Sequence, residues 1–173
     1  MILTINELKQ QVNCGTDTDD LITAKLEAIE AVIRAYTNNN FQQRCVRFCG
    51  RSEGAMVYGT TQFFSVNDTV QISGSGVNDG LYQVINVQAE YLQLDKPLMD
   101  VEFNLVTKVQ YPADVKQCAV DLYRWKQTMG DKVGIKSETL SRHSVTYEDS
   151  ATLFMGYPIG VLNGLNLHKK ARC

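Results

Sequence analysis

Apolar residues recur at helical spacing in two separate stretches of the chain. In the first stretch the steps between apolar positions are four, three, four and three residues: Ile22, Leu26, Ile29, Ile33 and Tyr36. In the second stretch the steps are again three and four residues: Val115, Cys118, Leu122, Trp125 and Met129. Such spacing puts the side chains of each stretch on one face of a helix. Each face needs a partner, so we expect the two helices to bury these faces against each other.

Polar residues mark where helices begin. Thr4 and Glu7 have the spacing of a capping box, which predicts a short helix that continues to about Val12. The acidic segment 17–20 then offers capping side chains and negative charge to the first long helix. Pro112 suits the first turn of the second long helix, because proline has no amide hydrogen to lose there.

Between residues 41 and 110 the pattern changes to short runs rich in β-branched and aromatic residues. These runs predict strands at 45–48, 55–58, 62–66, 70–72, 81–84, 91–94 and 101–105. So many short strands favour a small barrel or curled sheet, since closure removes exposed edges. The expected fold class is therefore α+β: a small helical bundle domain (1–44 plus 111–173) is interrupted by a small β-barrel-like insertion (45–110).

The last part of the chain mixes strand and helix signals. Residues 133–138 and 141–147 alternate like strands, and such a strand could pair with a partner chain as readily as with its own. After Tyr157 and Pro158, apolar residues predict a short helix that is weakened by two glycines. A basic tail then begins at His168.

Charge and cysteine content narrow the function classes. The 173 residues carry a net charge of -2, and residues 51–110 hold three basic against seven acidic side chains, a net charge of -4. This balance argues against a nucleic-acid-binding surface, which needs Lys and Arg to neutralise phosphate. The five cysteines are read as free thiols in a reducing cytosol, and the two histidines lack the spacing of a zinc site. No cofactor is expected, and no apolar run reaches the ~18 residues of a membrane span.

Two motifs could indicate chemistry, a phosphate-binding loop and a catalytic histidine, but the residues around them do not fit either one. Gly74, Ser75 and Gly76 could cradle a phosphate, but Asp79 stands where a third glycine would be expected and a strand follows instead of a helix. A hairpin tip is the better interpretation, with this contact loop: Gly74, Ser75, Gly76 and Asn78. His143 has serines nearby, but no nucleophile elbow surrounds them. We therefore expect no enzymatic activity.

The order and spacing of the flanking elements resemble the head-tail connector (adaptor) family of tailed bacteriophages. The resemblance is carried by the short first helix, the acidic cap before Leu21, the helix that ends at Tyr36, and four later segments: 112–116, 133–138, 144–147 and 158–162. The β insertion departs from the plain helical members. The resemblance implies a structural virion protein in the phage neck, assembled in the host cytoplasm as a ring, usually of twelve subunits.

The resemblance also implies partners. These are other copies of the chain, the portal protein above the ring, a head-closure (stopper) or tail protein below it, and double-stranded DNA that passes through without sequence-specific binding; no membrane is involved. The alternative is a small β-barrel module that binds nucleic acid or assists phage assembly. Ring formation would favour the connector, whereas a monomer that binds DNA with a steep salt dependence would favour the module.

Two sets of candidate contact residues follow from the resemblance. The first is a portal-contact arm that could be deleted without unfolding the protein: Tyr157, Ile159, Leu162, Leu165, Lys169, Lys170 and Arg172. A loose terminus is the competing interpretation of this segment. The second set is a candidate subunit interface: Ser137, Glu138, Arg142, His143 and Val145.

Overall fold

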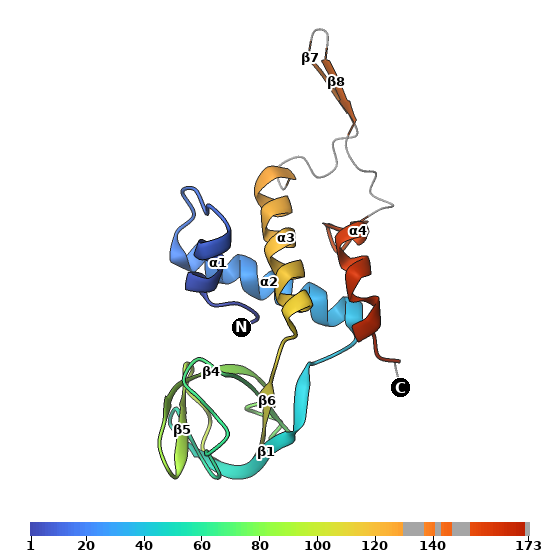
Figure 1. Cartoon of the computed structure of the whole chain (residues 1–173). Helices are drawn as coiled ribbons and strands as arrows, with labels where there is room; N and C mark the ends of the chain where they lie inside the picture. The colour runs from blue at the N-terminus through green and yellow to red at the C-terminus, as the bar shows by residue number, and fades with distance from the viewer. Residues whose placement is uncertain (130–136, 141–142, 147–152, 172–173) are drawn as a thin grey trace. The chain divides into compact units, whose positions relative to one another are not determined.

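The computed structural model describes residues 1–129, 137–140, 143–146 and 153–171. The chain divides into two compact units: Met1 with residues 40–111 forms the barrel unit, and residues 2–39 with 112–173 form the helical unit. Helices and a closed antiparallel barrel are both present (Figure 1), which confirms the α+β fold class. The description of the helices as a bundle stays a prediction.

The first two helices start at the capping residues that the sequence indicates. Helix α1 spans Ile5–Gln11, where the Thr4 hydroxyl accepts from the Glu7 amide at 3.2 Å and the Glu7 carboxylate accepts from the Thr4 amide at 2.7 Å. Helix α2 spans Asp19–Thr37 and is capped by the Thr18 hydroxyl. Each cap gives a hydrogen-bond acceptor to amides that the helix itself leaves unpaired.

Helix α3 spans Ala113–Met129 and is in contact with α2. On α2, the four aliphatic residues of the predicted stripe are fully buried: Ile22, Leu26, Ile29 and Ile33. On α3, Val115, Cys118 and Leu122 are buried, whereas Met129 is exposed. The predicted packing of one apolar face on the other is thus confirmed for the first three turns of α3.

The rest of the helical unit is made of short elements. Strands β7 (Ser137–Leu140) and β8 (His143–Thr146) form an antiparallel hairpin, so the predicted strand pairs within its own chain. Strands β9 (Leu153–Phe154) and β10 (Tyr157–Pro158) form a second small hairpin. The predicted short helix is present as α4 (Ile159–Leu162), followed by the 3₁₀ helix η3 (Asn163–His168).

The barrel unit is a closed six-stranded barrel in the order β1-β2-β5-β4-β3-β6. Its strands are β1 (Gln42–Glu53), β2 (Met56–Tyr58), β3 (Thr69–Ser73), β4 (Gly80–Val87), β5 (Tyr91–Leu94) and β6 (Val101–Val109). The strand predicted at 62–66 is wrong, because this segment is a turn. Its Phe64 ring packs edge-on against Phe48 inside the barrel, at 5.6 Å between ring centroids, while Phe63 and Val66 face outward.

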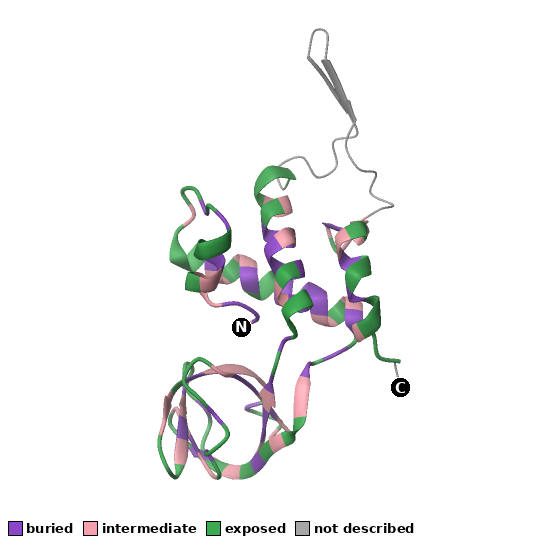
Figure 2. Cartoon of the chain, in the orientation of Figure 1, coloured by how far each residue is buried: buried purple, intermediate pink, exposed green. Residues whose placement is uncertain are grey.

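Buried apolar residues from all six strands form the core of the barrel. Figure 2 marks buried residues on the barrel strands in purple. The seam between β1 and β2 has only two paired positions, so side-chain packing closes it. Gly50 and Gly59 make this possible: a Cβ on Gly50 would lie 1.7 Å from the Tyr58 carbonyl oxygen, and a Cβ on Gly59 would lie 2.2 Å from the Phe48 ring. Only glycine lets the chain approach so closely at both points.

The chain enters and leaves the barrel at one end. Gln42, the first residue of β1, is paired with Val109, the last residue of β6. The opposite end is formed by three connections, which together we call the tip: residues 54–55 between β1 and β2, 74–79 between β3 and β4, and 95–100 between β5 and β6. Because neighbouring strands are antiparallel, these three connections meet at the same end.

Candidate functional site

One buried asparagine holds the tip together. The Asn78 side chain is 2% exposed, and its amide nitrogen lies 3.2 Å from the Ser52 hydroxyl, 2.8 Å from the Met99 carbonyl oxygen and 3.1 Å from the Asn104 side-chain oxygen. Its own oxygen accepts from the Met99 amide at 2.8 Å. A buried amide that is fully hydrogen bonded fixes the groups around it. The prediction of Asn78 as a contact residue is therefore corrected: it supports the tip from within.

The loop that carries Asn78 is also hydrogen bonded internally. The Asp79 carboxylate accepts from the Ser75 amide at 3.0 Å, the Ser75 hydroxyl at 2.9 Å and the Gly76 amide at 3.1 Å. These hydrogen bonds lower the pKa of the Asp79 carboxyl group, and the bond from the Ser75 hydroxyl has the largest effect. The carboxyl group is therefore charged at neutral pH. The predicted hairpin tip is confirmed, with Gly74, Ser75 and Gly76 in the connection between β3 and β4.

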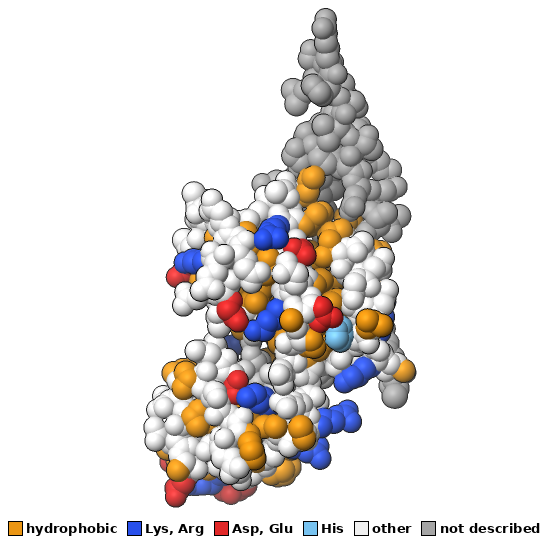
Figure 3. Space-filling model, in the orientation of Figure 1, with side chains coloured by type: hydrophobic (Ala, Val, Ile, Leu, Met, Phe, Trp, Pro, Cys, Tyr) orange, Lys and Arg blue, Asp and Glu red, His pale blue; other side chains and the backbone are white. Residues whose placement is uncertain are grey.

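Three exposed apolar side chains lie around Asn78. Val77 is 60% exposed, Met99 65% and Phe103 52%. Val77 precedes Asn78, Met99 is hydrogen bonded to it, and Phe103 precedes its partner Asn104. The barrel unit thus places large apolar groups in solvent (Figure 3). Such a group of side chains on a rigid support is typical of a protein contact surface.

A carboxylate lies close in sequence to each of these apolar residues. Asp79, Asp100 and Glu102 are exposed, and Asp100 accepts a hydrogen bond from the Gly54 amide at 2.9 Å. None of the three forms a salt bridge within the part of the chain that the structure describes. We count Glu102 and Phe103, at the start of β6, with the tip, which therefore carries exposed carboxylates as well as exposed apolar side chains.

The candidate portal-contact arm does not stand apart from the helical unit. Tyr157, Leu162 and Leu165 are buried there, and the Tyr157 ring lies 6.0 Å from that of Trp125. Burial raises the pKa of the Tyr157 hydroxyl group. The prediction that Leu162 and Leu165 anchor a partner is therefore corrected, because these leucines belong to the core of their own unit. Ile159 is partly buried.

Polar contacts tie the following residues to the end of α2. The Asn38 and Asn39 side-chain amides donate to backbone carbonyl oxygens of the C-terminal segment at 3.0–3.3 Å. The Lys169 ammonium group lies 3.8 Å from the centre of the Tyr36 ring. The Lys170 amide donates to the Thr37 carbonyl oxygen at 2.8 Å. The predicted arm residues Lys169 and Lys170 thus hold this segment in place, and Arg172 lies outside the described residues.

What the C-terminal segment offers to a partner differs from the prediction. Leu167 is 93% exposed, and Met155 is exposed as well. His168 Nε2 lies 2.6 Å from Asp114 Oδ2, and this hydrogen bond lowers the pKa of the Asp114 carboxyl group. Among the described residues of the segment, the exposed large apolar side chains are therefore Met155 and Leu167, beside exposed polar residues that include Lys169 and Lys170.

The candidate subunit-interface residues lie on the β7–β8 hairpin. Ser137 is paired with Thr146, Glu138 with Val145, and Leu140 with His143. Arg142 lies outside the described residues. The structure thus brings Ser137, Glu138, His143 and Val145 together on one hairpin.

One cluster of ionisable groups has a structural explanation. Asp17 Oδ2 accepts from Lys25 Nζ and from the Tyr123 hydroxyl group, both at 2.6 Å, and these two hydrogen bonds lower the pKa of the Asp17 carboxyl group. Burial, together with the bond to Asp17, raises the pKa of the Tyr123 hydroxyl group. The cluster joins the connection between α1 and α2 to α3, so it has a clear role in packing.

The described residues hold no group of three or more His, Cys, Asp or Glu side chains that could bind a metal ion. Cys14, Cys45, Cys49 and Cys118 are free thiols, and burial raises the pKa of Cys118 to about 12. No helix among the described residues is long and apolar enough to cross a membrane. No family model and no curated protein matches the chain.

Sequence reasoning missed the residues that form the surface of the tip. None of the three was singled out: Val77 and Met99 lie between predicted strands, and Phe103 lies within the strand predicted at 101–105. One signal was available: Val77 and Met99 are apolar residues inside polar connections, where a side chain has little to pack against. Their proximity depends on strand pairing, which local pattern does not reveal.

Proposed function

We propose that the protein is a structural virion component of the head-tail connector (adaptor) type, which forms a ring beneath the portal. The observation that carries the proposal is the tip of the barrel, where three exposed apolar side chains stand on a support fixed by Asn78. A rigid apolar surface at the end of an insertion suits contact with another protein. In this proposal the chain performs no chemistry.

The helical unit is proposed as the body of the ring. Helices α1, α2 and α3 would form the small helical bundle expected from the sequence, and the β7–β8 hairpin would meet the neighbouring copy through Ser137, Glu138, His143 and Val145. The proposed partners are other copies in a ring of twelve, the portal protein, and a head-closure or tail protein. The portal contact is now assigned to the exposed Met155 and Leu167.

Charge is consistent with a DNA conduit. The barrel unit contains five basic and seven acidic side chains, a net charge of -2, and the whole chain also carries -2. Many basic groups along a channel would retain phosphate and slow the passage of DNA. A chain that is slightly acidic would let double-stranded DNA pass.

A nucleic-acid-binding barrel is the second candidate. It is favoured by Arg44 and Arg47, which are exposed on β1, and by the exposed rings of Phe63 and Phe103, on which bases could stack. The excess of acidic side chains in the same unit weighs against it. We therefore place it second.

Light scattering and negative-stain microscopy of the purified protein test the first proposal. We expect self-association that increases with concentration, and ring-shaped particles. A protein that stays monomeric at every concentration, and that retains double-stranded DNA with a steep salt dependence, would replace the connector proposal with the second candidate.

A further inference from the structure

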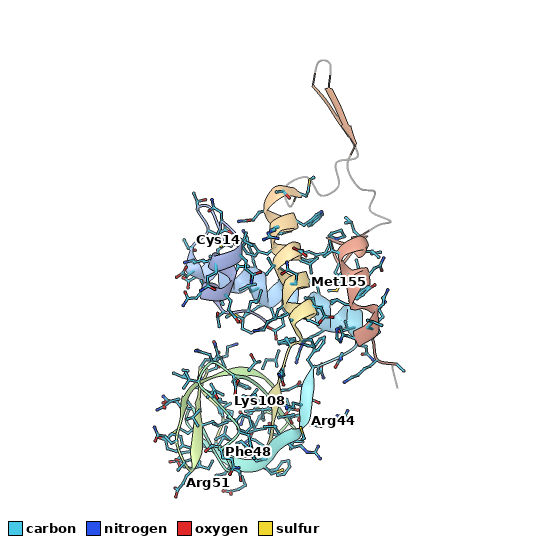
Figure 4. The ribbon with its side chains drawn as sticks, in the orientation of Figure 1. Cys14, Arg44, Phe48, Arg51, Lys108 and Met155 are labelled. Carbon is cyan, nitrogen blue, oxygen red and sulfur yellow. The ribbon has the colours of Figure 1, made fainter. Side chains whose placement is uncertain are left out.

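A bulge at the start of β1 displays two arginines. Between its pairings Gln42 with Val109 and Arg47 with Thr107, β1 advances five residues while β6 advances two. The three extra residues form a bulge, a feature that redirects side chains at the surface of a sheet. Arg44 and Cys45 lie in the bulge and Arg47 is the paired residue that ends it; all three are exposed, and Arg44 points away from the barrel (Figure 4).

These two arginines are not engaged within the protein. No hydrogen bond, ion pair or ring contact involves the side chain of Arg44 or of Arg47 among the residues that the structure describes. Arg51, further along the same strand, differs in this respect, because its guanidinium lies 4.4 Å from the centre of the Tyr58 ring and 3.5 Å from the Glu53 carboxylate. The start of β1 therefore carries available positive charge.

The tip of the same barrel has the opposite character. Asp79, Asp100 and Glu102 are exposed beside its apolar residues in the sequence, and none of the three forms a salt bridge among the described residues. The two surfaces lie at different places on one closed barrel, because β1 begins at the end where the chain enters and the tip is at the other end. A barrel with separate basic and acidic surfaces is complementary to another copy of itself.

In the proposed ring, each copy contacts its neighbour either through two identical surfaces or through two different surfaces. Pairing the β1 bulge with its own equivalent about a two-fold axis would place arginines against arginines, which is unfavourable. Pairing the bulge of one copy with the tip of the next brings opposite charges together. That head-to-tail contact repeats from copy to copy, as a ring requires.

We infer that the basic surface at the β1 bulge of one barrel (Arg44 and Arg47) binds the acidic tip of a second copy (Asp100, Glu102 and the exposed Met99). The inference rests on the proposed ring and names the barrel surfaces that would join its subunits. The inferred partner is a second copy and not DNA. A second copy offers carboxylates to the arginines and arginines to the acidic tip, whereas DNA phosphates would contact only the arginines.

Charge reversal tests the contact by sedimentation velocity. R44E/R47E and D100K/E102K should each weaken self-association by about tenfold or more, because each places like charges across the contact. The chain that carries all four substitutions should associate nearly as well as the original, since attraction is restored with its sign exchanged. Glu90→Lys, which makes the same charge change as one tip substitution but outside the tip, should have little effect.

Cross-linking tests the geometry directly. In a chain with Cys49→Ser and Cys173→Ser, the native Cys45 of the bulge and a cysteine introduced by Met99→Cys should be joined by a bismaleimide into dimers, trimers and larger species. Ile85→Cys is the matched control, because Ile85 is an exposed apolar residue of the same barrel outside the tip. Equal ladders from the two chains would overturn the inference.

The outcomes separate the inference from the ring proposal. Self-association that all charge reversals leave unchanged would overturn the barrel contact and leave the ring standing. DNA retention that R44E/R47E abolishes, with self-association intact, would also overturn it and would assign the arginines to phosphate. Absence of both self-association and cross-linked ladders would remove the ring and the contact together.

Discussion

At the scale of single residues, Asn78 replaces backbone pairing at the point where three connections of the barrel meet. Its amide is hydrogen bonded to groups from β1, β6 and the connection before β6, all far away in sequence. A hydrophobic residue of similar size could fill the space but could not form hydrogen bonds with these polar groups. The arrangement of the tip therefore depends on this one side chain.

Asn78→Ala should destabilise the barrel unit by about 2–4 kcal/mol, since it removes several buried hydrogen bonds at once and leaves their partners unsatisfied. Hydrogen exchange of the amides around Met99, combined with urea unfolding followed by circular dichroism, would measure the loss. Asn86→Ala is the control, because Asn86 is only partly buried and its side chain has a single weak contact of 3.4 Å with Gln88. If both substitutions had the same effect, the network would not support the tip.

At the scale of elements, the C-terminal segment looks like a free arm in sequence and is part of a core in the structure. Its apolar residues have the spacing of an amphipathic helix, but spacing alone does not say which surface they cover. Leu162 and Leu165 pack within the helical unit, and polar groups at the end of α2 hold the residues that follow. Deletion of 157–173 is therefore expected to destabilise the helical unit as well as remove a contact.

Two leucines of η3 separate the two roles of this segment. Leu165→Ala should lower the free energy of unfolding by about 2–5 kcal/mol, because it leaves a cavity in the core. Leu167→Ala should change it by no more than about 0.5 kcal/mol, because the side chain is in solvent. The fluorescence of Trp125 during urea unfolding would report both values. If both substitutions changed the free energy of unfolding by equally small amounts, the segment would be a free arm, as the sequence predicted.

The sequence predicted what local chemistry determines. The capping box at Thr4 and the apolar faces of α2 and α3 depend on residues a few positions apart, and the structure contains them. The number of short strands also predicted a barrel in outline. The strand order of that barrel, the inward turn of Phe64 and the exposure of Phe103 depend on contacts between distant residues. These were missed or misassigned, because period and propensity carry no information about which strand lies beside which.

At the scale of the whole molecule, carboxyl groups with a lowered pKa lie mainly in the helical unit. Hydrogen bonds from Lys25 and Tyr123 lower the pKa of Asp17, and the contact with His168 lowers that of Asp114. A carboxyl group whose pKa is lower in the folded than in the unfolded chain stabilises the protein above its unfolded pKa, and this contribution is lost as pH falls through the folded value. Acid should therefore weaken the helical unit.

Urea unfolding at several pH values would test this expectation. The midpoint followed by the single tryptophan, Trp125 in α3, should be lower near about pH 3 than near about pH 6, where both carboxylates are charged in the folded and unfolded chain. Asp17→Asn should reduce both the midpoint at neutral pH and its dependence on acid. A midpoint that did not vary over this range would show that these hydrogen bonds contribute little to stability.

The chain enters and leaves the barrel at the same end, so the barrel could be removed or replaced as one unit. The Gln110 amide donates to the Phe41 carbonyl oxygen at 3.0 Å, and the rings of Phe41 and Tyr111 lie 5.1 Å apart, so the two ends of the insertion are already joined. Replacing residues 42–109 by a short turn would therefore require little new chain. In evolutionary terms, a barrel attached in this way could be gained, exchanged or lost in a single step while the helical part kept its sequence.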